Sequence, residues 1–307
     1  MSSALGRAAR SAAAHRRLGR PRLLIVGCGD IGLRIVARLA GRFRVFGAVR
    51  GQDSADAVRL AGATPLRVDL DQWASLRRLR GLAPKVLVLA PTSPSGRGDR
   101  RARRLLSALR FAPGGRLVYL STSGVYGDRR GAWTDETATP QPRSERALRR
   151  LDAERQLRRS SWRAAVLRVP GIYGPARLPL ARLHEGLPVP PPERDVITNH
   201  IHADDLARAS IAALFRAAPT RLYNTVDDSQ MALGDYLDRV ADHAGLPRPP
   251  RAPWEQVRLA VGPQRMSFLE ESRRLSNRRL KRELRLRLRY PNVDAGLAAM
   301  ADRAPRR

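Results

Sequence analysis

Short runs of consecutive apolar residues alternate along this chain with longer stretches in which apolar residues recur every three or four positions. The short runs are typical of strands buried on both faces of a parallel sheet, and the longer stretches are typical of the helices that cover such a sheet. The pattern therefore predicts an α/β fold with a doubly wound parallel sheet. Strands are expected at residues 23–27, 44–49, 65–68, 85–90, 116–121, 164–169 and 222–224, and helices at residues 31–41, 54–61, 72–80, 99–111, 144–159 and 204–215.

The first predicted strand leads into a glycine-rich turn with the spacing G-x-G-x-x-G. Gly27 permits the tight turn, Gly29 has no side chain to hold a pyrophosphate away from the backbone, and Gly32 lets the helix pack close to the strand. Asp30 and Ile31 open that helix, whose N–H groups and positive dipole end attract phosphate. These five residues are predicted to bind a dinucleotide, and a purely structural turn is the alternative.

The end of the second predicted strand bears on the choice between NAD and NADP. NAD-binding proteins place an acidic residue about twenty residues after the glycines, where it holds the ribose hydroxyls. Here the strand is followed by Arg50, and no acid occurs before Asp53. Because an arginine pairs well with a 2′-phosphate, NADP is the predicted cofactor and NAD the alternative. Arg50 as one more surface arginine is the competing interpretation.

Composition narrows the class of protein. The formal net charge is +30 over 307 residues, but the positive charge is almost entirely arginine spread over every predicted helix, which favours a coding bias over a nucleic-acid site. Nucleic acid is therefore the third candidate partner, after a small-molecule substrate. No apolar run reaches the roughly 18 residues that a membrane span needs. The one cysteine, Cys28, cannot form an internal disulfide, which fits a cytoplasmic location.

The chain divides into a core, a cap and two tails. Residues 1–20 lack acids and apolar periodicity, and we expect a disordered tail that is dispensable for folding and cofactor binding. Residues 21–170, continued by 199–225, form the predicted core, with Asp204 as a helix N-cap. The proline-rich residues 171–198, expected to be irregular, and the basic residues 226–300 form the predicted substrate-binding cap, and residues 301–307 a second tail.

Six landmarks occur in a characteristic order: the glycine loop, Asp69-Leu70, Ala90-Pro91-Thr92, and the segments 119–127, 168–175 and 200–205. Together they resemble the extended short-chain dehydrogenase/reductase superfamily, in its NAD-dependent epimerase/dehydratase group, and more narrowly an atypical bacterial branch of it. The resemblance covers residues 22–225 and continues loosely to 296. It implies a Rossmann core with a small, mainly helical C-terminal cap, and a bound NAD or NADP. A homodimer is one arrangement open to such a chain.

The resemblance also implies roles for individual residues. Asp69 and Leu70 would meet the adenine, and Ala90 and Pro91 would line the nicotinamide side. The segment from Pro170 to Ile172 would pass beside the nicotinamide. Thr122 matches the residue that hydrogen-bonds a substrate oxygen, its alternative being a strand-end hydroxyl bonded to its own backbone.

Two departures from the family pattern affect the predicted chemistry. Redox-active members carry a Tyr-x-x-x-Lys pair that exchanges a proton as hydride moves. The aligned positions here are Arg146 and Arg150, whose guanidiniums stay charged. Ser123 and Gly124 stand where nucleotide-sugar dehydratases have Asp and Glu, which disfavours dehydration. The sequence thus predicts an NADP-dependent oxidoreductase or epimerase without the usual relay, or a non-catalytic sensor or scaffold.

Several other residues have two interpretations. Tyr126, Tyr173 and Glu136 are nearby titratable groups that could supply a proton, although each has a structural interpretation. His200 and His202 could face a metal, but a structural corner between strand and helix is favoured, and no metal is expected. The charge run at residues 278–282 is either a solvated helix face or an anion-binding patch for the substrate.

Overall fold

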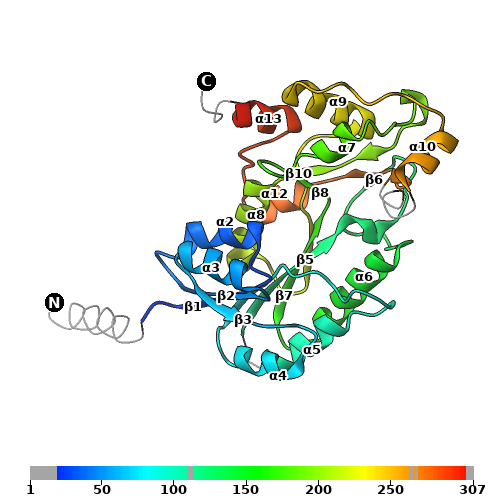
Figure 1. The fold of residues 1–307 in the computed structure, drawn as a ribbon. Helices are drawn as coiled ribbons and strands as arrows, with labels where there is room; N and C mark the ends of the chain where they lie inside the picture. Colours follow the sequence, from blue (N-terminus) through cyan, green and yellow to red (C-terminus); the bar gives the residue numbers. More distant parts are fainter. Residues whose placement is uncertain (1–18, 110–113, 263–265, 267–268, 302–307) are drawn as a thin grey trace, which may run out of the picture.

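A computed structural model describes residues 19–109, 114–262, 266 and 269–301. Within them, seven parallel strands form one sheet in the order β11-β7-β5-β4-β1-β2-β3 (Figure 1). The bounds of these strands are β1 Arg22–Val26, β2 Arg44–Val49, β3 Thr64–Arg67, β4 Lys85–Val88, β5 Arg116–Thr122, β7 Arg163–Val169 and β11 Arg221–Asn224. The predicted doubly wound α/β fold is thereby confirmed.

Helices cover both faces of the sheet because alternate strand residues point to opposite sides. In β1, Leu23 and Ile25 pack with α2 (Asp30–Leu39), α3 (Gln52–Leu60) and α8 (Ala203–Arg216). Leu24 and Val26 pack on the other face. That face is covered by α4 (Trp73–Leu76), the 3₁₀ turn η1 (Arg77–Leu79), α5 (Arg100–Ala108) and α6 (Glu145–Arg158).

The rest of the chain forms a lobe beyond the carboxyl ends of the strands (Figure 1). Its own apolar core is centred on Tyr173, Leu237 and Val240. Its elements, and those that join it to the sheet, are η2 Ser123–Tyr126, β6 Trp133–Thr134, β8 Gly171–Tyr173, α7 Leu180–His184, η3 Pro192–Arg194, β9 Ile197–Thr198, β10 His200–His202, β12 Met231–Ala232, α9 Leu233–Ala244, α10 Trp254–Val261, β13 Arg274–Leu275, α12 Arg278–Glu283 and α13 Val293–Ala301.

Two local expectations were wrong. Residues 171–198 are not irregular throughout, because β8 pairs with β10 and β9 pairs with β12, partners that lie close in space but distant in sequence. Asp204 does not cap α8. The cap is His202, whose Nδ1 accepts from the Asp204 N–H at 3.1 Å. The Asp204 carboxylate instead binds Arg34 of α2 at 2.8 Å, so the charge joins two helices.

The structure describes the chain from Gly19 to Ala301. The predicted tails, residues 1–20 and 301–307, therefore lie almost wholly outside the described residues. Among the helices that are described, none has both the length and the apolar composition needed to cross a bilayer.

Candidate active site

The three glycines of the first turn occupy different environments. Gly27 has a φ of +82°, and a Cβ on it would lie 2.6 Å from the Cα of Ala90, so only glycine fits there. A Cβ on Gly32 would lie 2.9 Å from Sγ of Cys28, which keeps α2 close to β1. A Cβ on Gly29 would meet no atom within 4 Å. The fold therefore requires Gly27 and Gly32, while Gly29 borders open space of the kind a pyrophosphate needs.

A cavity of about 400 Å³ lies at this turn. Seven of the residues predicted to bind the cofactor line it: Gly27, Gly29, Arg50, Asp69, Leu70, Ala90 and Pro91. No side chain caps the N-terminus of α2, so its first N–H groups are left for an anion. The open side of Gly29 and the uncapped helix together fit a dinucleotide pyrophosphate.

The remaining glycine-loop predictions concern the start of α2. Ile31 and Gly32 are buried in the helix. The Asp30 side chain is engaged, since Nε of Arg34 lies 2.9 Å from its Oδ1 and Nε of Arg177 lies 2.5 Å from its Oδ2. Asp30 and Ile31 can thus serve a cofactor through their backbones, and the Asp30 side chain ties α2 to the lobe.

Arg50 stands at the boundary of two hollows. It lines the glycine-loop cavity and also an adjoining cavity of about 430 Å³, whose wall includes Arg67 and Arg78. Arg101 also lines the glycine-loop cavity. Its guanidinium donates to both carboxylate oxygens of Asp71, from Nε at 2.9 Å and from Nη2 at 2.5 Å. That hydrogen bonding lowers the pKa of Asp71. Sequence reasoning missed Arg67, Arg78 and Arg101 because nothing separates them from the many other arginines.

A second cavity, of about 470 Å³, lies between the sheet and the lobe. It brings together Thr122, Arg146, Pro170 and Ile172 from the predicted set. The Thr122 Oγ1 accepts from the N–H of Gly124 at 3.2 Å, so its own hydroxyl hydrogen is left to donate into the cavity. Thr122 can therefore bond to its local backbone and still bind a substrate oxygen, because the bond from Gly124 occupies only one lone pair of the hydroxyl.

Arg146 and Arg150 lie one turn apart on α6. The Nη1 of Arg150 donates to the carbonyls of Leu120 at 2.7 Å and Ala90 at 3.3 Å, and to the Tyr119 hydroxyl at 3.0 Å. Arg150 thus lies between the strand that carries Thr122 and the wall of the glycine-loop cavity. Burial, and secondly the charge of Arg150, lower the pKa of Arg146.

The sequence model of the NAD dependent epimerase/dehydratase family matches residues 23–225. The solved structure of a functionally unknown conserved protein from Silicibacter pomeroyi is 31% identical to this chain. The match covers 92% of this chain and 99% of that one, with a TM-score of 0.75. The chain belongs to the NAD dependent epimerase/dehydratase family. The resemblance drawn from its six landmarks is confirmed, and the protein is an NAD(P)-binding member of this family.

Two solved epimerases share the fold of this family member. The UDP-glucose 4-epimerase of Thermus thermophilus, in complex with NAD, is 22% identical, with coverage of 92% and 98% and a TM-score of 0.68. The UDP-glucuronic acid 4-epimerase of Bacillus cereus, in complex with UDP-glucuronic acid and NAD, is 19% identical, with coverage of 92% and 98% and a TM-score of 0.71. No curated protein matches the chain.

The lobe side of the second cavity of this family member contains residues of which the sequence had marked only His200. They are Arg177, Arg273, Glu271, His200 and Tyr236. Nη1 of Arg273 lies 2.8 Å from the Glu271 carboxylate. The His200 ring stacks on Tyr236 with centroids 4.0 Å apart, and burial lowers the His200 pKa to about 3, so the imidazole is neutral. These residues come from distant parts of the chain, so no local spacing could have grouped them.

The alternative proton donors lie elsewhere. Tyr126 donates its hydroxyl to Oδ1 of Asn224 at 2.7 Å, and Tyr173 donates to the carbonyl of Asn292 at 2.9 Å. Glu136 accepts from the Asn224 N–H at 2.9 Å. None of the three lines the cavity that contains Thr122. Among the described residues no group of three or more potential metal ligands occurs either.

Proposed function

We propose that the protein is an NADP-dependent oxidoreductase or epimerase that acts on a small anionic substrate without a Tyr-Lys proton relay. The observation that carries this proposal is the position of Arg150. Its hydrogen bonds to the carbonyls of Ala90 and Leu120 link the wall of the glycine-loop cavity to the strand that ends at Thr122. A substrate held by Thr122 would therefore lie next to the cofactor site.

The preference for NADP rests on Arg50 and its neighbours. A 2′-phosphate carries negative charge, and guanidiniums bind such groups through charge-assisted hydrogen bonds. Arg50, Arg67 and Arg78 line one hollow beside the glycine-loop cavity, and Asp69 is the acid on its wall. An NAD-binding site would instead present an acid to the ribose hydroxyls at the position of Arg50.

The anionic character of the substrate follows from the second cavity. Three guanidiniums, those of Arg146, Arg177 and Arg273, line it against the single carboxylate of Glu271. A bound nicotinamide dinucleotide supplies the hydride acceptor or donor for chemistry there. Thr122 orients a substrate oxygen, and Arg146 stabilises negative charge near that oxygen but holds its own protons. The exchanged proton then comes from Tyr236, Glu271 or water.

Cofactor titration tests this proposal. Purified protein is titrated with NADP and with NAD, and the same titrations are made on Arg50→Ala and on the exposed control Arg42→Ala. We expect NADP to bind the wild type at least about tenfold more tightly than NAD. Arg50→Ala should lose that preference and Arg42→Ala should keep it, since loss of a charged hydrogen bond costs roughly 1.5–3 kcal/mol. Tighter binding of NAD by the wild type would contradict the proposal.

A non-catalytic sensor or scaffold is the second candidate, and the arginines at the Tyr-Lys positions favour it. A panel of carbonyl compounds, hydroxy acids and phosphorylated sugars separates the two. Turnover of any panel member supports the enzyme. Tight NADP binding without turnover supports the sensor.

A further inference from the structure

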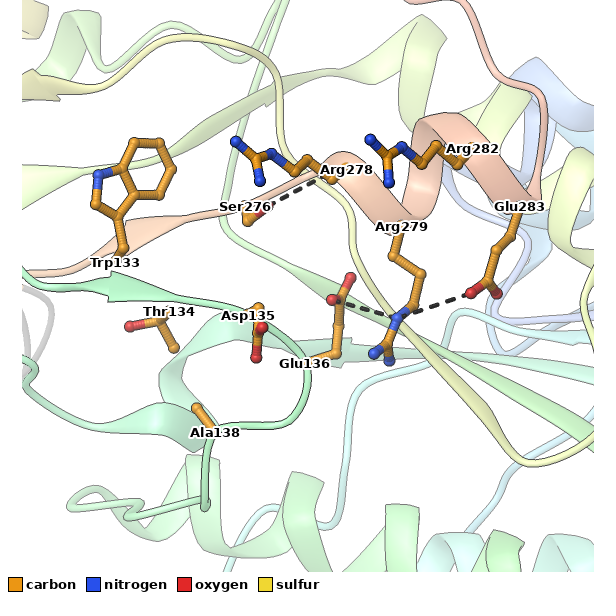
Figure 2. Close-up of a pocket in the computed structure, with 10 residues that line it drawn as sticks. All are labelled: Trp133, Thr134, Asp135, Glu136, Ala138, Ser276, Arg278, Arg279, Arg282 and Glu283. Atoms are coloured by element: carbon orange, nitrogen blue, oxygen red, sulfur yellow. Dashed lines mark hydrogen bonds and ion pairs between the residues drawn. The ribbon is translucent and has the colours of Figure 1, made fainter.

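A third cavity, of about 770 Å³, lies between the segment 133–138 and α12 (Figure 2). None of the residues on its wall belongs to the wall of the glycine-loop cavity or the second cavity. The proposed function assigns no role to it. Its size falls in the range of about 300–1,000 Å³ that is usual for small-molecule sites.

The acidic groups on this wall have partners of their own. The Asp135 carboxylate accepts from the N–H of Thr137 at 2.8 Å and from its hydroxyl at 2.5 Å. Glu136 accepts from the Asn224 N–H at 2.9 Å and pairs with Arg279 at 3.5 Å. The Glu283 carboxylate is paired with Arg221, whose guanidinium donates to both carboxylate oxygens.

Two arginines of the same wall differ in this respect. No hydrogen bond or ion pair joins the guanidinium of Arg278 or of Arg282 to any residue that the structure describes. Both residues are exposed on α12, four positions apart, so their side chains leave the same face of the helix. Figure 2 shows both guanidiniums extending toward the segment that carries Trp133. The cavity thus offers two positive charges without an acidic partner.

Trp133 supplies a flat apolar surface at the same opening. Its side chain is 64% exposed, although large aromatic rings are usually buried. An exposed ring beside guanidiniums matches a ligand with one flat ring and one anionic group. Aromatic rings stack on nucleobases irrespective of sequence, and arginines bind phosphate oxygens in pairs.

We propose that this cavity binds a free nucleoside phosphate, with the base stacked on Trp133 and the phosphate held by Arg278 and Arg282. The segment 133–138 and α12 wall the cavity on two sides, which favours a single nucleotide over a strand (Figure 2). The site is separate from the cofactor cavity, so occupation of one leaves the other open.

Isothermal titration with ATP tests the proposal on the full-length protein. Trp133→Ala and the pair Arg278→Ala/Arg282→Ala should each weaken ATP binding by about fivefold or more, the smallest loss usual when a stacking ring is removed. Trp73→Ala and Arg287→Ala, which remove exposed residues outside this wall, should bind ATP like the wild type. Binding at the glycine loop is common to all variants and cancels in the comparison.

Two further ligands separate the contribution of Trp133 from that of the two arginines, and a free nucleotide from a strand. Tripolyphosphate lacks a base, so Trp133→Ala should bind it as the wild type does, while the double arginine variant should bind it more weakly. Equal ATP affinity in all variants overturns the proposal, as does a loss of tripolyphosphate binding in Trp133→Ala. The proposal is also overturned if an oligothymidylate binds more tightly than ATP and this binding depends on Trp133, Arg278 and Arg282. The ligand of the cavity would then be a nucleic-acid strand.

Discussion

Glu154 and Arg168 form an ion pair in which both side chains are only 1% exposed. Nη2 of Arg168 lies 2.7 Å from Oε2 of Glu154, and Nε lies 3.2 Å from Oε1, which gives a two-pronged contact. Ser121 adds its hydroxyl to the same carboxylate at 2.5 Å. The pair joins α6 to β7 and β5, so it fixes the helix that carries Arg150 against the strand that ends at Thr122.

Glu154→Gln should destabilise the protein by about 3–5 kcal/mol, because it leaves the Arg168 guanidinium buried without a counter-charge. Urea unfolding at pH 7 measures this loss. Glu145→Gln on the same helix is the matched control, since its carboxylate is 68% exposed although it also pairs with an arginine. It should change stability by less than about 0.5 kcal/mol. Equal effects of the two substitutions would show that burial of the pair is unimportant.

Asp227 should make stability fall as the pH rises. Burial raises its pKa to about 8, against about 3.9 for an ordinary aspartate. The folded chain therefore keeps a proton that the unfolded chain releases above pH 4. The stability linked to that proton is complete below pH 4 and is lost as the pH rises to about 8. One oxygen of the Asp227 carboxylate accepts from the Ser229 N–H at 2.8 Å.

Asp227→Asn removes the titration and keeps the shape of the side chain. Unfolding in urea at pH 5 and pH 8 should show a larger drop in stability for the wild type than for this variant. Asp56→Asn, whose side chain is 54% exposed on α3, should keep the wild-type pH dependence. A wild type as stable at pH 8 as at pH 5 would contradict the raised pKa.

Local periodicity was enough to predict the core. The order of β1, the glycine turn and α2 follows from four apolar residues, three glycines and a helical repeat, all within seventeen residues. The same reasoning placed β2 at its observed bounds. Such elements depend on neighbours a few positions away, so one sequence contains the information for them.

Pairings between distant residues could not be predicted in this way. Arg177 reaches Asp30 across 147 positions, and β13 pairs with β6 because the chain returns from the lobe to the segment that follows β5. Arg273 and Glu271 enter the second cavity for the same reason. Arg50 was marked by its distance from the glycine loop and Arg146 by the family resemblance. Neither periodicity nor spacing marks Arg67, Arg177 or Arg273 as different from other surface arginines, so their place on a cavity wall emerges only from the fold.

Gly29→Ala separates a cofactor site from a structural turn. Gly29 has a φ of −86° and open space where a Cβ would lie, so alanine should leave the melting temperature almost unchanged. The added methyl group should nevertheless weaken NADP binding by about tenfold or more, since it stands where the pyrophosphate approaches. Gly41→Ala, which also meets open space, should bind NADP like the wild type. Undiminished NADP affinity in Gly29→Ala would favour the structural turn.

Substitutions around Thr122 test how the protein manages without a Tyr-Lys pair, once a substrate is known. Thr122→Ala removes one hydrogen bond to an uncharged partner. The loss of roughly 0.5–1.5 kcal/mol of transition-state binding should appear as a lower kcat/KM. Arg146→Ala should chiefly raise KM, because the guanidinium lines the substrate cavity and binds an anion rather than exchanging a proton. Arg150→Ala should lower NADP affinity through the carbonyl of Ala90, which lies on the cofactor cavity.

Arg155→Ala, an exposed position on the same helix, serves as the control for these kinetic measurements. The pH profile of kcat/KM supplies an independent readout. Since guanidiniums stay charged in proteins, the pH profile should keep the same shape in the wild type, Arg146→Ala and Arg155→Ala. Arg146→Ala and Arg150→Ala could instead lose all turnover while their substrate and NADP affinities persist. These arginines would then act in the chemical step, which would contradict the proposal that they only bind and orient.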